Sequence, residues 1–253
     1  MRKIDNIKVY IGWDPRDYAA YQVAVASLMR HATIPVHVVP LIDRDLRKRG
    51  EYWRSYHVDH RGQMWDDTDG KPFSTQFSFT RFCVPGLEEY GSRWVLFTDA
   101  DMMWRADIAE LVAHVDAQKS LFVVKHDHRP REREKLDGVL QTTYERKNWS
   151  SVMLMCPERC RTWTKFAVNN WDGGSLHGLQ GFEDDAIGEL PEAWNWLEGH
   201  SSPDLEPKLV HYTRGTPDME GHEGSAYANE WWGYYEEAAN SQVVDYPLQA
   251  ASA

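Results

Sequence analysis

The chain has 253 residues and is 42% hydrophobic, so it can bury a sizeable core in one large domain or two small ones. Its 39 acidic and 28 basic residues leave a net charge of −11, which argues against nucleic acid or an anionic membrane as the main partner. The three cysteines cannot all pair, and they lack a second Cys/His pair at zinc spacing, so we expect a reducing compartment.

Neither the start of the sequence nor any later run predicts insertion into a membrane. Residues 1–6 turn polar at once and lack the apolar core of a signal peptide, and no run approaches the roughly 18 to 20 apolar residues of a span. We therefore expect a soluble, cytoplasmic protein without a transmembrane segment. Its twelve tryptophans and twelve tyrosines weakly favour a carbohydrate ligand, because aromatic faces stack on sugar rings as well as filling cores.

The first forty residues predict a strand, a helix and a second strand. Residues 7–11 form the first strand, which Gly12 ends by permitting a tight turn, and Asp14 can cap the helix that Pro15 begins. Residues 16–30 carry apolar side chains at helical spacing, and residues 36–40 form the next strand. This βαβ unit predicts a parallel sheet with ligands outside the carboxyl ends of its strands.

Residues 43–72 form a long polar insertion beside the predicted sheet. Two Asp-x-Asp pairs, at Asp43/Asp45 and Asp67/Asp69, have polar surroundings and are interpreted as solvated loops. Loops of this length are often functional, so the insertion either helps to shape an acceptor site or is an ordinary surface subdomain. A helix is expected over residues 74–87, with Arg81 on it as a candidate contact for phosphates.

A third Asp-x-Asp pair differs from the other two in its apolar surroundings. Residues 94–97 predict a short buried strand, and Asp99 and Asp101 follow it, two positions apart and therefore on one side of an extended backbone. Two neighbouring carboxylates repel each other unless a cation lies beside them, and oxygen ligands suit Mg²⁺ or Mn²⁺ better than zinc. The pair therefore predicts a metal site that handles phosphate. The alternative is an N-cap or turn pair.

The middle of the chain continues the α/β pattern without a linker. We expect a helix over residues 106–111, strands over 121–125 and 151–156, and a helix over 161–171. The cluster at residues 126–128, His-Asp-His, is interpreted as a turn beside solvent or, alternatively, as a metal site. The charged residues 129–147 are interpreted as a mobile lid.

The last part of the chain adds acidic residues and one histidine to the candidate site. Glu183, Asp184 and Asp185 are expected at the start of a helix, where they suit its dipole, and one of them could reach the reacting group. We expect a loop and short strand over 191–196, and His211 at the end of the last strand, as a polar tip or as a ligand returning to the aspartates. A helix is expected over residues 229–240. We assign residues 1–235 to a single domain and residues 236–253 to a C-terminal tail.

Five motifs in this order resemble the GT-A glycosyltransferases, and most nearly their family-eight type and its bacterial relatives. The resemblance runs from about Lys8 to Gly215 and includes residues 10–14, 97–101, 148–154, 183–187 and 211–215. It implies a Rossmann-like, mostly parallel central sheet flanked by helices. It also implies a metal-dependent hexosyl transfer from a nucleotide-sugar donor, most often UDP-linked, with retention at the anomeric carbon. The acceptor would be a glycan, a lipid-linked molecule or a small molecule.

The resemblance also assigns roles to individual residues. Asp99, Asp101 and His211 would bind Mn²⁺ (or Mg²⁺) together with the donor diphosphate, so that the metal neutralises the leaving group. The donor would further be held by Gly12, Trp13, Asp14, Arg81, Ala100, Asn148 and Ser150. Glu183 and Asp184 would lie near the anomeric carbon as candidate catalytic residues.

The sequence departs from the family pattern at two places. Trp149 and Ser150 replace a pair that is usually small, which would narrow the sugar pocket. The lysine motif after the final histidine is replaced by residues 216–218, so Arg214 or Arg81 would contact the diphosphate instead.

Three other functions remain open from the sequence. A haloacid-dehalogenase-like phosphatase also ends a strand in Asp-x-Asp, with the first aspartate as nucleophile. In that class the motif usually opens the sheet near the N-terminus, whereas several elements precede it here. A glycosidase would not need two carboxylates crowded at one strand tip. The third alternative is a non-catalytic nucleotide-sugar-binding protein.

Overall fold

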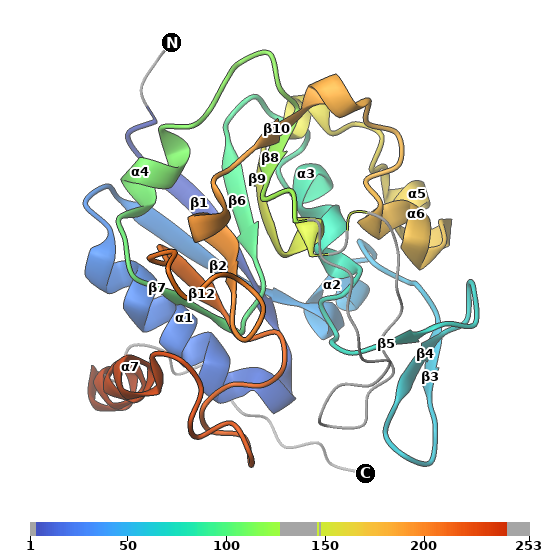
Figure 1. The fold of residues 1–253 in the computed structure, drawn as a ribbon. Helices are drawn as coiled ribbons and strands as arrows, with labels where there is room; N and C mark the ends of the chain where they lie inside the picture. The colour runs from blue at the N-terminus through green and yellow to red at the C-terminus, as the bar shows by residue number, and fades with distance from the viewer. Residues whose placement is uncertain (1–3, 127–145, 147, 242–253) are drawn as a thin grey trace.

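The computed structural model describes residues 4–126, 146 and 148–241 of the chain. The predicted mostly parallel sheet is present as six strands in the order β10-β8-β9-β6-β1-β2 (Figure 1). Only β9 runs antiparallel to its neighbours, β6 and β8, within this sheet. The strands are β1 (Ile7–Trp13), β2 (Val36–Ile42), β6 (Val95–Thr98), β8 (Leu121–Val123), β9 (Val152–Met155) and β10 (Ile187–Glu189).

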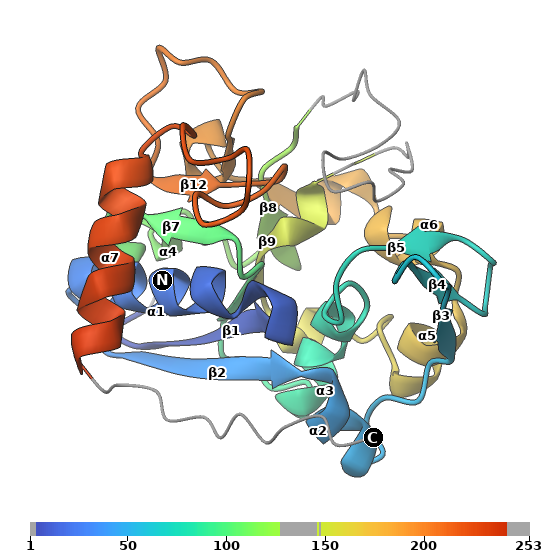
Figure 2. The same cartoon turned by 90° about the horizontal axis from the view of Figure 1, so that it is seen from below.

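A second, smaller sheet stands beside the first and is central to the candidate site. Its order is β11 (Trp196–Leu197), β12 (Leu209–His211) and β7 (Met102–Trp104), with β12 antiparallel to β7. Helix α1 (Tyr18–His31) packs against β7 and β1, and α7 (Ala228–Ser241) packs across α1 (Figure 2). The backbone N–H of Trp104 donates to Ser27 Oγ, which ties this sheet to helix α1.

The remaining helices are short. They are α2 (Asp43–Lys48), α3 (Val84–Leu87), α4 (Ile108–Val112), α5 (Lys165–Asn170) and α6 (Gly173–His177). Six 3-10 turns join the elements: η1 (Pro15–Asp17), η2 (Thr80–Cys83), η3 (Trp149–Ser151), η4 (Pro157–Arg159), η5 (Asp184–Ala186) and η6 (Glu192–Asn195). As predicted, Asp14 caps the turn that Pro15 begins, because its side chain accepts from the N–H of Arg16.

The insertion at residues 43–72 is ordered rather than a loose loop. It contains α2 and an antiparallel sheet of β3 (Tyr56–Val58), β4 (Met64–Asp66) and β5 (Pro72–Phe73). Arg54 is buried, donates from Nε to Asp66 Oδ1 at 3.0 Å, and reaches the carbonyls of Val168 and Trp171 beside α5. The insertion is therefore anchored to the body of the fold by a buried guanidinium that is paired with a carboxylate and bonded to two carbonyls.

Three local predictions are wrong. Asp43 is not solvated but buried, and its charge is matched by Arg47 one helical turn later, with Nε 2.6 Å from Oδ1. The expected helix over 74–87 is limited to η2 and α3, and Pro85, which offers no N–H and whose ring would clash with a carbonyl one turn earlier, prevents a continuous α-helix through both. The acidic residues at 183–185 begin no α-helix, because the chain passes from η5 directly into the edge strand β10.

Other predictions fall partly or wholly on residues outside the described part. The suggested lid at 129–147 is described only at Arg146, and the cluster at 126–128 only at His126. The expected tail begins inside α7, and its residues 242–253 are not described. Among the described residues, no helix has both the length and the apolarity needed to cross a bilayer.

Candidate active site

Three chain segments meet at the edge of the main sheet where its parallel strands end. In β1 and β6, Ile11 is level with Thr98, so Gly12 and Asp99 follow side by side. Because β9 runs antiparallel to β6, its first residue, Val152, is also level with Thr98. The turn η3, which precedes β9, therefore lies at the same edge. The register thus brings residues 12–14, 99–101 and 148–151 together, as expected for the carboxyl edge of such a sheet.

The two aspartates lie at the point where the chain leaves one sheet for the other. Asp99 follows β6 of the main sheet, Asp101 precedes β7 of the small sheet, and fully buried Ala100 forms the bend between them. The prediction of an extended backbone here is therefore wrong, but the bend still leaves the two carboxylates close together. The N–H of Asp99 donates to Ser151 O at 3.0 Å, and Asp101 O accepts from the N–H of Tyr212 at 3.0 Å.

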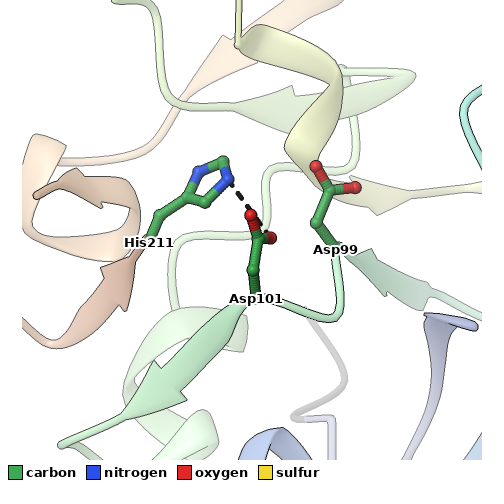
Figure 3. Close-up of side chains that lie close together, drawn as sticks. All are labelled: Asp99, Asp101 and His211. Carbon is green, nitrogen blue, oxygen red and sulfur yellow. Dashed lines mark ion pairs between the residues drawn. The ribbon is translucent and has the colours of Figure 1, made fainter. Parts of the chain in front are cut away.

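His211 enters the same site from β12. It pairs with Met102 in the antiparallel ladder, so its side chain can reach the aspartate that precedes β7 (Figure 3). One ligand atom from each of Asp99, Asp101 and His211 lies within 4.8 Å of the other two, and His211 Nε2 is 3.4 Å from Asp101 Oδ1. The fractional exposure of these side chains is 13%, 27% and 4% respectively, so the carboxylates keep access to solvent while the imidazole is enclosed.

This donor set fits a divalent cation. Two carboxylates and one imidazole offer two hard oxygens and one nitrogen, which suits Mn²⁺ or Mg²⁺ completed by water or substrate phosphate. No pair of cysteines takes part, because the three thiols are buried elsewhere in the fold. The sequence-predicted ligands are therefore brought together, with chemistry that can hold the predicted ion.

Arg81 lies against Asp99 rather than at the surface. Its Nη1 is 2.9 Å from Asp99 Oδ1 and 2.9 Å from the carbonyl of Ser150, and Nε donates to Phe77 O. The guanidinium also lies over the ring of Phe97 at 4.9 Å, and the residue is buried. One positive charge thus offsets part of the negative charge of the aspartates from within the protein.

Ser150 is buried and reaches His177 of α6. The distance from Ser150 Oγ to His177 Nδ1 is 2.8 Å, and the imidazole is packed between the rings of Phe79 and Phe82. Burial, with the nearby charges of Arg81 and Arg54, holds the pKa of His177 well below its ordinary value. His177 is therefore neutral at physiological pH and supports the turn that carries Ser150.

Gly12 and Asp14 both have clear structural roles at this edge. A Cβ on Gly12 would lie 2.5 Å from the ring of Phe77, so only glycine fits there without movement. Asp14 is fully buried; burial alone would raise its pKa, but the hydrogen bonds from Arg16 and the N–H of Gln76 lower it. Trp13 is half-buried at the end of β1.

Asp184 is connected to the site by an arginine. Arg146 donates to Asp184 Oδ1 and to Gly178 O, and its guanidinium lies 5.4 Å from the ring centroid of Trp149. The backbone carbonyls of Asp185 and Ala186 accept hydrogen bonds from Lys119 Nζ and from the N–H of Ser120, at the amino end of β8. Glu183 and Asp184 are both exposed and lie outside the three-residue cluster.

Asn148 and Asn195 complete the surroundings of the site. Asn148 adopts a left-handed backbone, with φ of 64°, a conformation that asparagine tolerates better than most residues. Its carbonyl accepts from Asn195 Nδ2 and from Ser151 Oγ. Asn195 was not singled out from the sequence. The sequence signal for Asn195 is a single amide side chain between Trp194 and Trp196, because a polar group buried among aromatic residues needs hydrogen-bond partners.

Solved structures of glycosyltransferases share this architecture. The WbbM bifunctional glycosyltransferase has a TM-score of 0.59 at 13% identity, covering 95% of this chain and 52% of WbbM. GlyE of Streptococcus pneumoniae gives 0.55 at 16% identity, covering 93% and 62%. The galactosyltransferase LgtC, solved with donor and acceptor sugar analogues, gives 0.53 at 12% identity, covering 91% and 96%. This chain thus spans about half of WbbM. At these identities the likeness establishes the fold: the chain has the GT-A fold.

The sequence comparison identifies the family. No protein-family model matches the chain. It is 40% identical over 237 residues to Protein CDI of Arabidopsis thaliana, covering 91% of this chain and 86% of that protein. The chain therefore belongs to the family of Protein CDI.

Proposed function

We propose that this protein is a metal-dependent glycosyltransferase that moves a hexose from a nucleotide-sugar donor, UDP-linked, to an acceptor. One observation carries the proposal: Asp99, Asp101 and His211 converge within 4.8 Å at the carboxyl edge of a GT-A sheet. The resemblance to the family-eight type supports retention at the anomeric carbon. The glycosyltransferases of the same fold support the reaction class, and the acceptor is a glycan, a lipid-linked molecule or a small molecule.

The residues of the cluster suit the departure of a nucleoside diphosphate. Mn²⁺ or Mg²⁺, when bound, supplies Lewis-acid stabilisation of the charge that develops on the leaving group. Asp99, after β6 of the main sheet, and Asp101, before β7 of the small sheet, would hold the ion together with His211 of β12. The guanidinium of Arg81 lies 2.9 Å from the Asp99 carboxylate. Its positive charge would help to stabilise the negative diphosphate of the donor.

The donor is placed by the segments that meet at this edge. Gly12, Trp13 and Asp14 would border the base and ribose, with Ala100 at the bend. Asn148 and Ser150 would border the sugar. Asp184 and Glu183 are proposed near the anomeric carbon, and the link from Asp184 through Arg146 to Trp149 supports Asp184 as the first to test.

A screen of donors tests this function. Purified protein is incubated with UDP-, GDP-, CMP- and dTDP-linked sugars with Mn²⁺ or with EDTA, and the released nucleotide is measured. We expect metal-dependent release of UDP, lost in Asp101→Asn and kept in Asp204→Asn, which removes an exposed carboxylate outside the cluster. NMR of the transferred sugar determines whether the anomeric configuration is retained.

Two of the three alternatives predict other results, the phosphatase in a separate assay. A non-catalytic binding protein would bind a nucleotide sugar tightly without releasing nucleotide against any acceptor. A phosphatase would release phosphate from simple monoesters, but the GT-A fold disfavours it. The cytoplasmic location expected from the sequence stays a prediction.

A further inference from the structure

We infer that Asn195 is a positioning residue for the metal site: its side-chain amide fixes the orientation and tautomer of His211. Asn195 is fully buried in η6, and its Oδ1 lies 2.8 Å from His211 Nδ1. This inference rests on the proposed function, because it gives His211 the role of a metal ligand. It adds a residue that neither the sequence motifs nor the family resemblance assigned.

The orientation of the Asn195 amide follows from its other partners. Nδ2 lies 3.2 Å from the carbonyl oxygen of Asn148 and 2.9 Å from Ser151 Oγ. A carbonyl oxygen can only accept, so the group facing it must be the NH₂ donor. Ser151 Oγ donates its own proton to the same carbonyl at 2.6 Å, which leaves the hydroxyl a lone pair for Nδ2.

The fixed amide determines which nitrogen of His211 faces the aspartates as an acceptor. Because Oδ1 of Asn195 can only accept, Nδ1 of His211 must carry its proton. Nε2, which points at Asp101, is then the nitrogen whose lone pair is available to a cation. Metal-bound histidines commonly donate their other N–H to such an oxygen, which sets the ring plane and the tautomer.

The same small network reaches Asp99. Ser151 bonds Asn195 through its hydroxyl and accepts the N–H of Asp99 through its carbonyl, at 3.0 Å. Ser151, which directly precedes β9, therefore fixes Asp99 of the main sheet and, through Asn195, His211 of the small sheet. Ser151 and Asn195, which are not themselves ligands, thus hold the ligands of the two sheets in place relative to one another.

The inference is tested on the full chain by titration with Mn²⁺ alone. Binding is measured as the loss of the EPR signal of the free ion. Asn195→Leu removes the acceptor at similar volume, and we expect Mn²⁺ affinity to fall about 10- to 100-fold. Asn195→Asp keeps an oxygen facing His211 Nδ1 but places a carboxylate against the Asn148 carbonyl. We expect it to lower the thermal midpoint while retaining most of the affinity.

A matched control separates positioning from loss of stability. Asn169 is also a buried asparagine, bonded through Oδ1 to the N–H of Trp53 and through Nδ2 to Lys165 O, in α5. Asn169→Leu should lower the thermal midpoint and leave Mn²⁺ affinity unchanged. Wild-type affinity in Asn195→Leu, together with loss of binding in His211→Ala, would overturn the inference while keeping the metal site. Failure of the wild-type chain to bind the ion would instead count against the proposed function.

A second measurement determines the tautomer of His211 on the wild-type chain itself. Histidine-labelled protein with saturating Mg²⁺ is examined by long-range ¹H–¹⁵N NMR, with the His211 signals assigned from their absence in His211→Gln. We expect a proton on Nδ1 and none on Nε2. A proton on Nε2 with a bare Nδ1 would contradict the inference directly.

Discussion

Nη1 of Arg81 lies 2.9 Å from Oδ1 of Asp99, and both side chains are largely buried, with fractional exposures of 6% and 13%. The guanidinium also binds the carbonyl of Ser150, so one side chain holds the first aspartate against the turn before β9. The carboxylate pair is therefore already partly neutralised by the fold, and its geometry depends on that cation.

Removing this cation should destabilise the protein. In Arg81→Leu, Asp99 loses its counter-charge in a largely buried position, and we expect the free energy of unfolding to fall by about 3–5 kcal/mol. Urea denaturation measures the effect. Lys208→Leu is the control, because Lys208 pairs with Glu110 at the exposed surface and should change stability by less than about 1 kcal/mol. Equal effects in the two variants would show that Arg81 does not stabilise Asp99.

The imidazole of His177, packed between the rings of Phe79 and Phe82, should make stability depend on pH. Its pKa in the folded protein is well below 6.5, whereas the unfolded chain takes up a proton near 6.5. Stability should therefore fall as pH decreases below 6.5, by about 1.4 kcal/mol per pH unit, until the folded-state pKa is reached. His177→Phe, which suits the neighbouring aromatic rings, should remove this slope, and His60→Phe at an exposed position should keep it. Parallel slopes in all three proteins would contradict the assignment.

Gly12 should be required for packing. A methyl group there would lie 2.5 Å from the ring of Phe77, so Gly12→Ala should cost about 1–3 kcal/mol of stability. Phe77→Leu provides the room, so the double variant should be closer to the wild type than the sum of the two single changes. Strict additivity in a double-mutant cycle would show that the two residues do not oppose each other.

The exposed acidic residues before β10 differ in their contacts, and so should their variants. If Asp184 acts near the anomeric carbon, Asp184→Asn should lower kcat about 10²- to 10⁴-fold with little change in KM. Asp185→Asn is the neighbouring control, since Asp185 is exposed and its backbone carbonyl, rather than its carboxylate, accepts from Lys119. Steady-state rates of nucleotide release measure both. A larger loss in Glu183→Gln than in Asp184→Asn would transfer the role to Glu183.

The sequence predicted the parts of the site that depend on strand ends. A βαβ start, an apolar strand before Asp99 and a late strand ending at His211 are enough to bring these residues to one edge of a sheet. The periodicity of short strands also located most of the elements, although their bounds shift by a few residues.

What could not be predicted depends on contacts between distant segments. The buried Arg54 needs a carbonyl from α5, more than 100 residues away. No local sequence pattern predicts that Asn195 faces His211, because η6 and β12 meet only when the small sheet forms. The wrongly predicted helix start at 183 has a similar cause, since pairing of β10 with β8 overrides the local preference of acidic residues for helix ends.

Calorimetric titration of UDP into the purified protein, once with Mn²⁺ and once with EDTA, tests the central claim most directly. The wild type should bind UDP only with the metal. Asp101→Asn should not bind under either condition, while Asp204→Asn should behave as the wild type. UDP affinity that is unchanged by EDTA, or by Asp101→Asn, would contradict the assignment of Asp99, Asp101 and His211 as the metal site of a glycosyltransferase.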